Sequence, residues 1–496
     1  MLWEGKIWLA RSTGGEDLFL LPQKACRHGV LAGMNNYEVT LGAQVLAEGF
    51  SDLGIPVFML DDSNRLAGML NPRKDSGQLG DKSAFFDLEE SGFTCQGYPV
   101  TFWDIYGQTG IPLRASMMKM GPRIISHILS LNKTQSQLLK IIFHIAHDQG
   151  LRINDIRDLK AMINYYQSHI ENYRYEYGLI DNYSLEELFR SVISLENKGL
   201  GRFFYEPALD IIDLLQTDSS GKGMINILDS HSLVFDSHLY SGILLWLLIE
   251  ASKCMPAIDM PEQPRMVFII DEAQLLFKNI SLPLLEKVEH HICKLESKGI
   301  SVFFCTQNMT DLPEMVLNHL ENKIHFAPQA YTPSAQKATR SAAMYFRKNP
   351  SFDTYKTLLN LGSGTVLISL IEKNGVPSVV EKAYILPTQS EGGQISYAER
   401  DKCIRNSIVY SKYSQVHDFE SAYEFIERRK IEEAKQIEKH LFGTVESTAF
   451  GKQYSSNTDK GTTSTSYSHF NMVGDAEPIS KRKKSSGGFF RNLFKK

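Results

Sequence analysis

The sequence predicts an α/β protein in which helices cover a mainly parallel sheet, with an all-α insertion and a flexible C-terminal tail. Short apolar runs alternate with helical segments early and late in the chain, the pattern of a parallel sheet covered on both faces. Residues 124–215 instead keep a helical period throughout. Residues 443–480 are polar and rich in Ser, Thr and Gly, a composition that does not form a core by itself.

The expected strands are short runs rich in β-branched and aromatic residues, and the expected helices repeat apolar residues every three or four positions. The strands are Leu18–Leu21, Gly29–Gly33, Ile55–Leu60, Val100–Ile105, Met224–Leu228, Met266–Ile270, Ser301–Thr306 and Thr365–Leu370. The helices outside the insertion are Thr40–Leu53, Tyr240–Lys253, Leu282–Lys298 and Ser421–His440.

These elements divide the 496 residues into five segments. We expect the first part of the core at 1–123, the helical insertion at 124–220, and the second part of the core at 221–390. A helical extension at 391–442 and a polar linker with a basic-aromatic tail at 443–496 complete the chain.

Charge and cysteine usage limit the classes of function. Residues 481–496 carry seven basic residues and no acidic one, which leaves −11 for the first 480 residues of a chain whose net charge is −4. No overall basic field therefore indicates a nucleic-acid binder. The six cysteines lack metal-site spacing, and we expect them to be reduced core residues. Neither a signal peptide nor a membrane-spanning run stands out, so we expect a cytoplasmic protein, with peripheral membrane attachment left open.

The strongest chemical signal is an apolar run, MVFIIDEAQLLF, that ends in Asp271 and Glu272. Adjacent acids at the end of a buried strand suit a nucleoside triphosphatase, because one can hold Mg²⁺ while the next orients the attacking water. We therefore predict Asp271 as a metal ligand and Glu272 as the catalytic carboxylate that orients or deprotonates the attacking water, against the alternative of two solvated acids.

A second signal follows the run HGVLAG, where residues 33–40 occupy the place of a phosphate loop. Gly33 and Thr40 have the separation of the pattern GxxxxGK[ST], in which glycines and lysine surround phosphate and Ser or Thr binds Mg²⁺. Glu38 stands in the place of the second glycine, however, and Val39 in the place of the lysine. The loop is degenerate, and we predict that it fails as a working phosphate site.

Motifs in the same order over about residues 15–385 resemble the YjgR-like branch of the HerA/FtsK superfamily. They are FLLPQKACRHGVLAG, IPVFMLDD, FWDIYG, LRASMMKMGP, LSLNKTQSQLLKIIFHIAHDQGL, TDSSGKGMINIL, VFIIDEAQLLF, SKGISVFFCTQN, YTPSAQKA and GSGTVLISL. The resemblance implies a RecA-like ATPase core with ATP and Mg²⁺ at the subunit interfaces of a ring. It also implies kinship with DNA translocases that work with a nuclease partner.

The departures from the family pattern occur at the positions that the resemblance assigns to ATP binding and hydrolysis. Besides Glu38 and Val39, the usual Asp-Glu-Ala-His has become Asp-Glu-Ala-Gln. Family members also tend to carry arginines where this chain has Glu296, Lys323 and Gln329, and an arginine that reaches a neighbour's nucleotide accelerates hydrolysis by orders of magnitude. The family's scaffold residues remain, namely Gly33, Thr40, Asp271, Glu272 and Gln307, the last in the place of a γ-phosphate sensor or of a polar cap.

Three hypotheses of function stay open at this point. The first is a pseudo-ATPase, an ATPase fold with hydrolysis lost or very weak, that serves as a structural or regulatory subunit of a homo-oligomer or of a mixed ring with an intact HerA-like relative. The second is a residual ATPase or DNA motor whose basic group comes from elsewhere, for example from Lys222.

The third hypothesis makes the tail the functional element. KRKKSSGGFFRNLFKK places basic residues around Phe490, Leu493 and Phe494, which share one face if the segment is helical. Such a segment suits an anionic membrane, a partner groove or single-stranded nucleic acid, and a solvated tail is the plain alternative.

Overall fold

The computed structural model describes residues 1–74, 80–178, 182–258, 262–416 and 420–442. Two compact units, Met1–Glu433 and Ala434–Lys496, divide the chain. The tail at 443–496, and with it the predicted basic-aromatic segment, lies outside the described residues. No helix among those described is long and apolar enough to cross a membrane.

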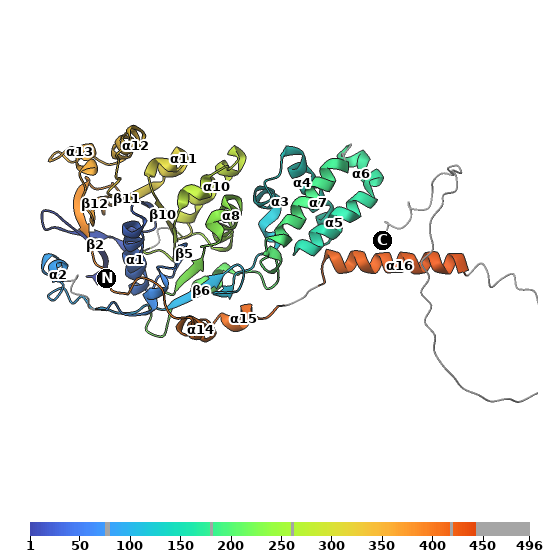
Figure 1. Cartoon of the computed structure of the whole chain (residues 1–496), viewed down its shortest axis with the longest axis horizontal. Helices are drawn as coiled ribbons and strands as arrows, with labels where there is room; N and C mark the ends of the chain where they lie inside the picture. The colour runs from blue at the N-terminus through green and yellow to red at the C-terminus, as the bar shows by residue number, and fades with distance from the viewer. Residues whose placement is uncertain (75–79, 179–181, 259–261, 417–419, 443–496) are drawn as a thin grey trace, which may run out of the picture. The chain divides into compact units, whose positions relative to one another are not determined.

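The described part of the first unit contains one sheet of 13 strands, and its centre is parallel (Figure 1). In spatial order from β1 to β7, the strands are β1 (Leu2–Trp3), β2 (Lys6–Ser12), β13 (Glu381–Ile385), β12 (Thr365–Ser369), β11 (Leu320–Phe326), β4 (His28–Ala32), β10 (Ile300–Thr306), β9 (Met266–Ile270), β5 (Val57–Asp61), β8 (Ile225–Asp229), β6 (Val100–Asp104) and β7 (Ile111–Pro112). β3 (Asp17–Leu20) pairs with β2 off this path. From β11 to β7 every pairing is parallel, and from β11 outward to β1 every pairing is antiparallel.

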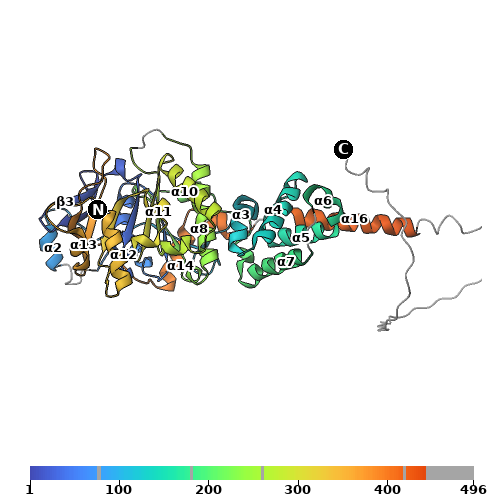
Figure 2. The same cartoon turned by 90° about the horizontal axis from the view of Figure 1, so that it is seen from above.

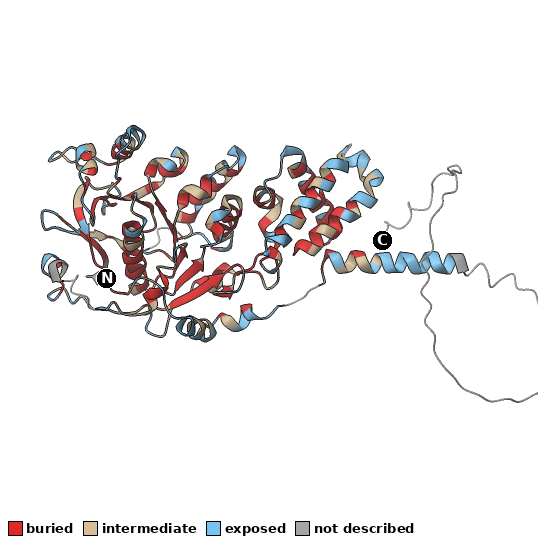
Figure 3. Cartoon of the chain, viewed as in Figure 1, coloured by how far each residue is buried: buried red, intermediate tan, exposed pale blue. Residues whose placement is uncertain are grey.

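Both faces of the sheet are covered, as expected for a parallel sheet. Successive side chains of a strand point to opposite faces, and those of β5 divide in this way between two apolar cores. Val57 and Met59 join the core under α1 (Asn36–Asp52), whereas Phe58 and Leu60 join the core under α8 (Ser237–Cys254) and α10 (Leu282–Glu296). The central strands are accordingly buried along their length (Figure 3). The predicted RecA-like, mainly parallel fold is confirmed.

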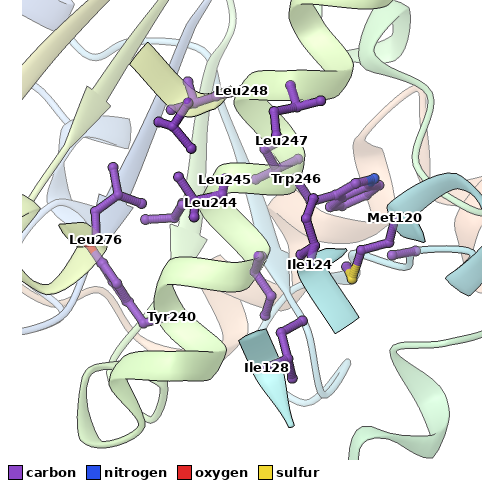
Figure 4. Close-up of a cluster of buried hydrophobic side chains, with 14 of the residues drawn as sticks. Met120, Ile124, Ile128, Tyr240, Leu244, Leu245, Trp246, Leu247, Leu248 and Leu276 are labelled. Carbon is purple, nitrogen blue, oxygen red and sulfur yellow. The ribbon is translucent and has the colours of Figure 1, made fainter. Parts of the chain in front are cut away.

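Helices of the insertion gather beside α8 (Figure 2). They are α3 (Met117–Ile128), α4 (Lys133–Asp148), α5 (Ile156–Ser168), α6 (Ile170–Tyr177) and α7 (Asn182–Asn197). Ile124 of α3 lies beside Trp246 of α8 (Figure 4), and Ile128 lies against Gly242 of α8 in the same buried cluster. Since α8 covers the sheet, this contact fixes the insertion to the core.

The other α-helices that the structure describes belong to segments outside the insertion. They are α2 (Gly80–Phe86), α9 (Ala273–Phe277), α11 (Glu314–Leu317), α12 (Pro333–Met344), α13 (Thr354–Leu359), α14 (Tyr397–Asn406), α15 (Tyr410–Ser414) and α16 (Ala422–Phe442). At the start of α16, Ala422 donates its N–H to Arg152 O at 3.0 Å, and Ile426 is buried. This contact ties the beginning of the last described helix to the insertion.

Two expectations need correction. The helix predicted at Thr40 begins four residues earlier, because the Asn35 side chain caps it by accepting from Tyr37 N at 3.2 Å. The six cysteines are free, but they are not all core residues: Cys26 and Cys305 are buried, whereas Cys95 and Cys254 are exposed. Apolar neighbours in the sequence therefore did not establish burial.

Candidate functional site

The connection between β4 and α1 is the predicted phosphate loop. Gly33 belongs there because an added Cβ would lie 2.7 Å from Phe326 Cβ, so only glycine allows this close approach. The helix starts at Asn36. Residues 36 and 37, which the phosphate-loop pattern places in the loop, are thus already helical.

Backbone donors of the loop are directed into the protein. Gly33 N donates to Thr306 O at 3.1 Å, and Met34 N donates to Ala327 O at 3.4 Å. The Asn35 side chain accepts from Tyr37 N, and the Asn35 carbonyl accepts from Glu38 N and Val39 N. A phosphate loop works by pointing such N–H groups at the ligand. Five of them already have acceptors in this chain.

The two substituted positions have structural partners. Glu38 is 7% exposed, and its Oε1 accepts from Ser363 Oγ and from Gly364 N, the latter at 3.1 Å. Its carboxylate therefore anchors the loop before β12. Val39 is 3% exposed and packs in the core beneath α1. The lysine position thus faces the protein interior.

Thr40, the expected metal ligand of the loop, also has an internal partner. Its Oγ1 donates to Asn36 O at 2.7 Å, one turn back along α1. The hydroxyl oxygen keeps acceptor capacity, so it remains able to bind a cation. The loop as a whole does not fit the phosphates of ATP, because its lysine is absent and its donors are used.

The predicted acids lie at the carboxyl end of β9, two strands from β4 and separated from it by β10. Glu272 adopts φ +46°, a left-handed conformation that is uncommon outside glycine. Its Oε1 accepts from Asn36 Nδ2 at 2.9 Å, and its Oε2 accepts from Gln274 Nε2. Gln274 Oε1 in turn accepts from Thr306 Oγ1 at 2.9 Å. A hydrogen-bond network therefore joins the loop to the ends of β9 and β10.

Charge around these acids is negative. Burial, with the nearby Asp62 as the next cause, raises the pKa of Asp271 to about 8. Burial and Asp62 also raise the pKa of Glu272. Asp271 and Asp62 follow neighbouring strands, β9 and β5, and carboxylate oxygens are the ligands that Mg²⁺ prefers. These acids do not form a close group of three metal-binding atoms among the described residues, so Mg²⁺ binding by Asp271 stays a prediction.

A sequence model of the family described as Helicase HerA-like C-terminal matches residues 7–477. The chain belongs to this HerA-like family. The predicted membership of the HerA/FtsK superfamily is confirmed, and the YjgR-like branch stays a prediction.

Several solved structures are similar to this HerA-like chain. VirB4 of Thermoanaerobacter pseudethanolicus matches with a TM-score of 0.49 and 14% identity, over 78% of this chain and 98% of that one. The bacterial conjugative coupling protein TrwBdeltaN70 matches with a TM-score of 0.49 and 12% identity, over 79% and 91%. The genome packaging NTPase B204 from Sulfolobus turreted icosahedral virus 2 matches with a TM-score of 0.22 and 17% identity, over 36% and 73%. A search of curated proteins finds no match.

Lys222 cannot replace the missing lysine of this HerA-like chain. Its Nζ donates to Gln96 Oε1 at 2.7 Å and lies 3.5 Å from Asp52 Oδ1, at the C-terminal end of α1. The phosphate loop is at the other end of that 17-residue helix, about 24 Å away at 1.5 Å per residue. The suggestion that Lys222 supplies the basic group is wrong.

Three other cations do lie beside the loop. A cavity of about 720 Å³ borders Glu38 and Thr40, and Arg65, Arg73 and Lys74 also line it. Sequence reasoning missed these cations because they follow the loop by 25 residues or more; Arg65 comes shortly after the Asp61-Asp62 strand end.

Two of these cations are already engaged within the chain. Arg73 donates to Thr388 Oγ1 at 3.0 Å, and Lys74 Nζ lies 3.2 Å from Glu391 Oε1. The Arg65 guanidinium lies 5.8 Å from the ring centre of Tyr37. Arg73 and Lys74 thus contact residues 388 and 391, whereas Arg65 contacts the ring of Tyr37 in the loop.

The remaining predicted positions are spread over the sheet. Gln307 directly follows β10 and is half-buried, and Asn308 caps a short helical turn by accepting from Thr310 N at 3.3 Å. Glu296 pairs with Arg27 at 3.0 Å, and burial lowers the pKa of Lys323. Gln307 thus shares the site edge with the acids, whereas Glu296 and Lys323 have structural surroundings.

Proposed function

We propose that this HerA-like chain is a pseudo-ATPase that acts as a structural or regulatory ring subunit. One observation carries the proposal: the lysine position is Val39, buried in the core, and the neighbouring Glu38 carboxylate anchors residues 363 and 364. A negative charge and an apolar side chain stand where phosphate needs backbone donors and a cation.

Glu272 supports the same interpretation. Both of its carboxylate oxygens accept from side-chain amides, those of Asn36 and Gln274. A general base must reach the water that it activates. Held in this way, Glu272 serves to join α1 to β9 rather than to orient a nucleophile.

Steady-state phosphate release from ATP and Mg²⁺ tests the proposal, with Glu272→Gln as the matched control. Glutamine has the shape of glutamate but lacks its charge. We expect both proteins to give the rate of a blank without protein. Release by the wild type that Glu272→Gln abolishes would contradict the proposal.

Assembly is the second part of the proposal. We expect a homo-oligomer or a mixed ring with an intact HerA-like relative, and a nuclease or another effector as a further partner. A chain with the fold of a ring ATPase family but without a working phosphate loop still has the surfaces through which subunits of such a ring would contact one another. Mass measurement with and without such a relative tests this part.

A second candidate function is nucleotide binding with weak turnover, which the three cavity cations favour. Phosphate contacts from Arg65 or Arg73 could partly replace those of the missing lysine. Equilibrium binding of ATP to the wild type, Arg65→Ala and Arg347→Ala tests it. Arg347 donates to Pro377 O and is not among the residues that line the cavity, so it serves as the control. Loss of one charge-assisted contact should weaken binding about tenfold or more.

The third candidate is an adaptor role for residues 481–496, which the structure does not describe. Basic residues near an anionic membrane contribute about 1 kcal/mol each, and buried aromatic rings add to this. Only the sequence supports this proposal. In it, the tail binds a membrane surface or single-stranded nucleic acid. A peripheral membrane location would follow from the first of these.

A further inference from the structure

Glu289, Cys293 and His319 bring three different metal-binding atoms together at one point. His319 Nε2 lies 2.9 Å from Glu289 Oε1 and 3.3 Å from Cys293 Sγ, and Sγ lies 3.4 Å from the same Oε1. Each atom therefore lies within 3.4 Å of the other two. The sequence did not reveal this cluster, because Cys293 and His319 are 26 positions apart.

These separations suit a tetrahedral zinc ion. Zinc binds thiolate sulfur at about 2.3 Å, and imidazole nitrogen and carboxylate oxygen at about 2.0–2.2 Å. At tetrahedral angles those bond lengths place the donors about 3.4–3.6 Å from one another. The cluster needs to open by only a few tenths of an ångström, and a fourth position stays free for water.

Ordered elements hold the three side chains. Glu289 and Cys293 are four residues apart on α10, so they share one face of that helix. His319 directly precedes β11, whose first residue Leu320 pairs with His28 at the start of β4. The side chains of His319 and Glu289 are 38% and 27% exposed, which gives an ion access from solvent.

We propose that Glu289, Cys293 and His319 form a zinc site at the end of the sheet where the central strands β4 and β11 begin. The thiol of Cys293 releases its proton to solvent on binding, the neutral imidazole of His319 donates an electron pair from Nε2, and Glu289 binds through Oε1. The ion would link α10 to the start of β11. Because the phosphate loop is at the opposite end of β4, this proposal is independent of the proposed function.

The chain contains a matched control for the cluster. Cys254 on α8 is exposed, and its Sγ lies 3.7 Å from Oε1 of Glu250, also four residues earlier on a helix. Among the described residues, that pair has no third ligand within reach. If a helical Glu–Cys pair were sufficient for metal binding, the two sites would behave alike.

Titration of the full-length, chelator-treated protein with Co²⁺, followed by displacement with Zn²⁺, tests the proposal. We expect one equivalent of Co²⁺ with a thiolate-to-cobalt charge-transfer band and tetrahedral visible bands, both lost when Zn²⁺ is added. Cys293→Ser should remove the thiolate band, and His319→Gln should weaken binding by about tenfold or more. Cys254→Ser should bind like the wild type.

Far-ultraviolet circular dichroism confirms that each variant is folded. If Cys293→Ser does not fold, His319→Gln and Cys254→Ser decide the question. The proposal is wrong if the wild type gives no thiolate band, if the band survives in Cys293→Ser, or if His319→Gln binds Co²⁺ as tightly as the wild type. It is equally wrong if Cys254→Ser lowers binding as much as the cluster variants do.

Discussion

Replacing Glu38 by alanine tests the anchor that occupies the phosphate-loop position. The carboxylate accepts from Ser363 Oγ and from Gly364 N, and its Oε2 is buried without a partner among the residues that the structure describes. Hydrogen bonds to a charged group contribute about 1.5–3 kcal/mol each. Relief of the unpaired oxygen offsets part of that loss, so we expect a net local cost of about 2–3 kcal/mol.

Hydrogen exchange of the segment around residues 361–366 measures this cost directly, because Gly364 N–H is one of the two donors. At 1.36 kcal/mol per tenfold change, exchange in Glu38→Ala should be about 30–150 times faster than in the wild type. Glu38→Gln is the matched control, since its amide oxygen keeps one acceptor, and should change exchange by less than about tenfold. Unchanged exchange in Glu38→Ala would refute the anchoring role.

Three further predictions concern acid stability, assembly and the tail. Burial lowers the pKa of His28 to about 4, whereas the unfolded side chain titrates near 6.5; the unfolded state therefore gains the proton first, and stability falls as the pH drops from about 6.5 to 4, by up to about 3 kcal/mol. His28 Nδ1 accepts from Val302 N, and glutamine at this position does not titrate. The free energy of unfolding of His28→Gln, measured with urea at several pH values, should therefore fall less between pH 6.5 and about 4 than that of the wild type. An equal fall would contradict this. Mass measurement at micromolar protein should show an oligomer, alone or with an intact HerA-like relative, and a monomer in both cases would count against a ring. Deletion of residues 481–496 should release the protein from anionic vesicles without lowering its melting temperature; identical partitioning of the full-length and truncated chains would exclude anchoring.

Apolar runs predicted most strands of the parallel part of the sheet, namely β4, β10, β9, β5, β8 and β6. The run at β9 was predicted with its observed bounds, Met266–Ile270, because five consecutive apolar residues end abruptly at two acids. β11, by contrast, reads LENKIHF and was missed. Its polar residues are accommodated by local partners: Asn322, for example, donates to Arg27 O at 3.1 Å. Such partners come from distant segments and leave no periodic signal.

The candidate site was predicted in its location but not in its contacts. Gly33 follows β4, and Asp271 and Glu272 follow β9, so they lie at the same end of the sheet with β10 between the two strands, because parallel strands bring their carboxyl ends together. The roles of these residues and of Thr40 stay predictions. Motif spacing could not show that Glu38 turns away from the loop to bind residues 363 and 364, which are more than 320 positions later. The cavity cations were hidden for the same reason.

A single-turnover experiment tests the central claim, the loss of hydrolysis, most directly. Protein in excess over labelled ATP, with Mg²⁺, detects even one slow turnover per chain, and DNA added in a parallel sample covers stimulation by a nucleic acid. The structure predicts no phosphate above the protein-free blank for the wild type or for Glu272→Gln, because Val39 supplies no cation and the Glu272 carboxylate is held by Asn36 and Gln274. Phosphate formed by the wild type and not by Glu272→Gln would contradict the claim.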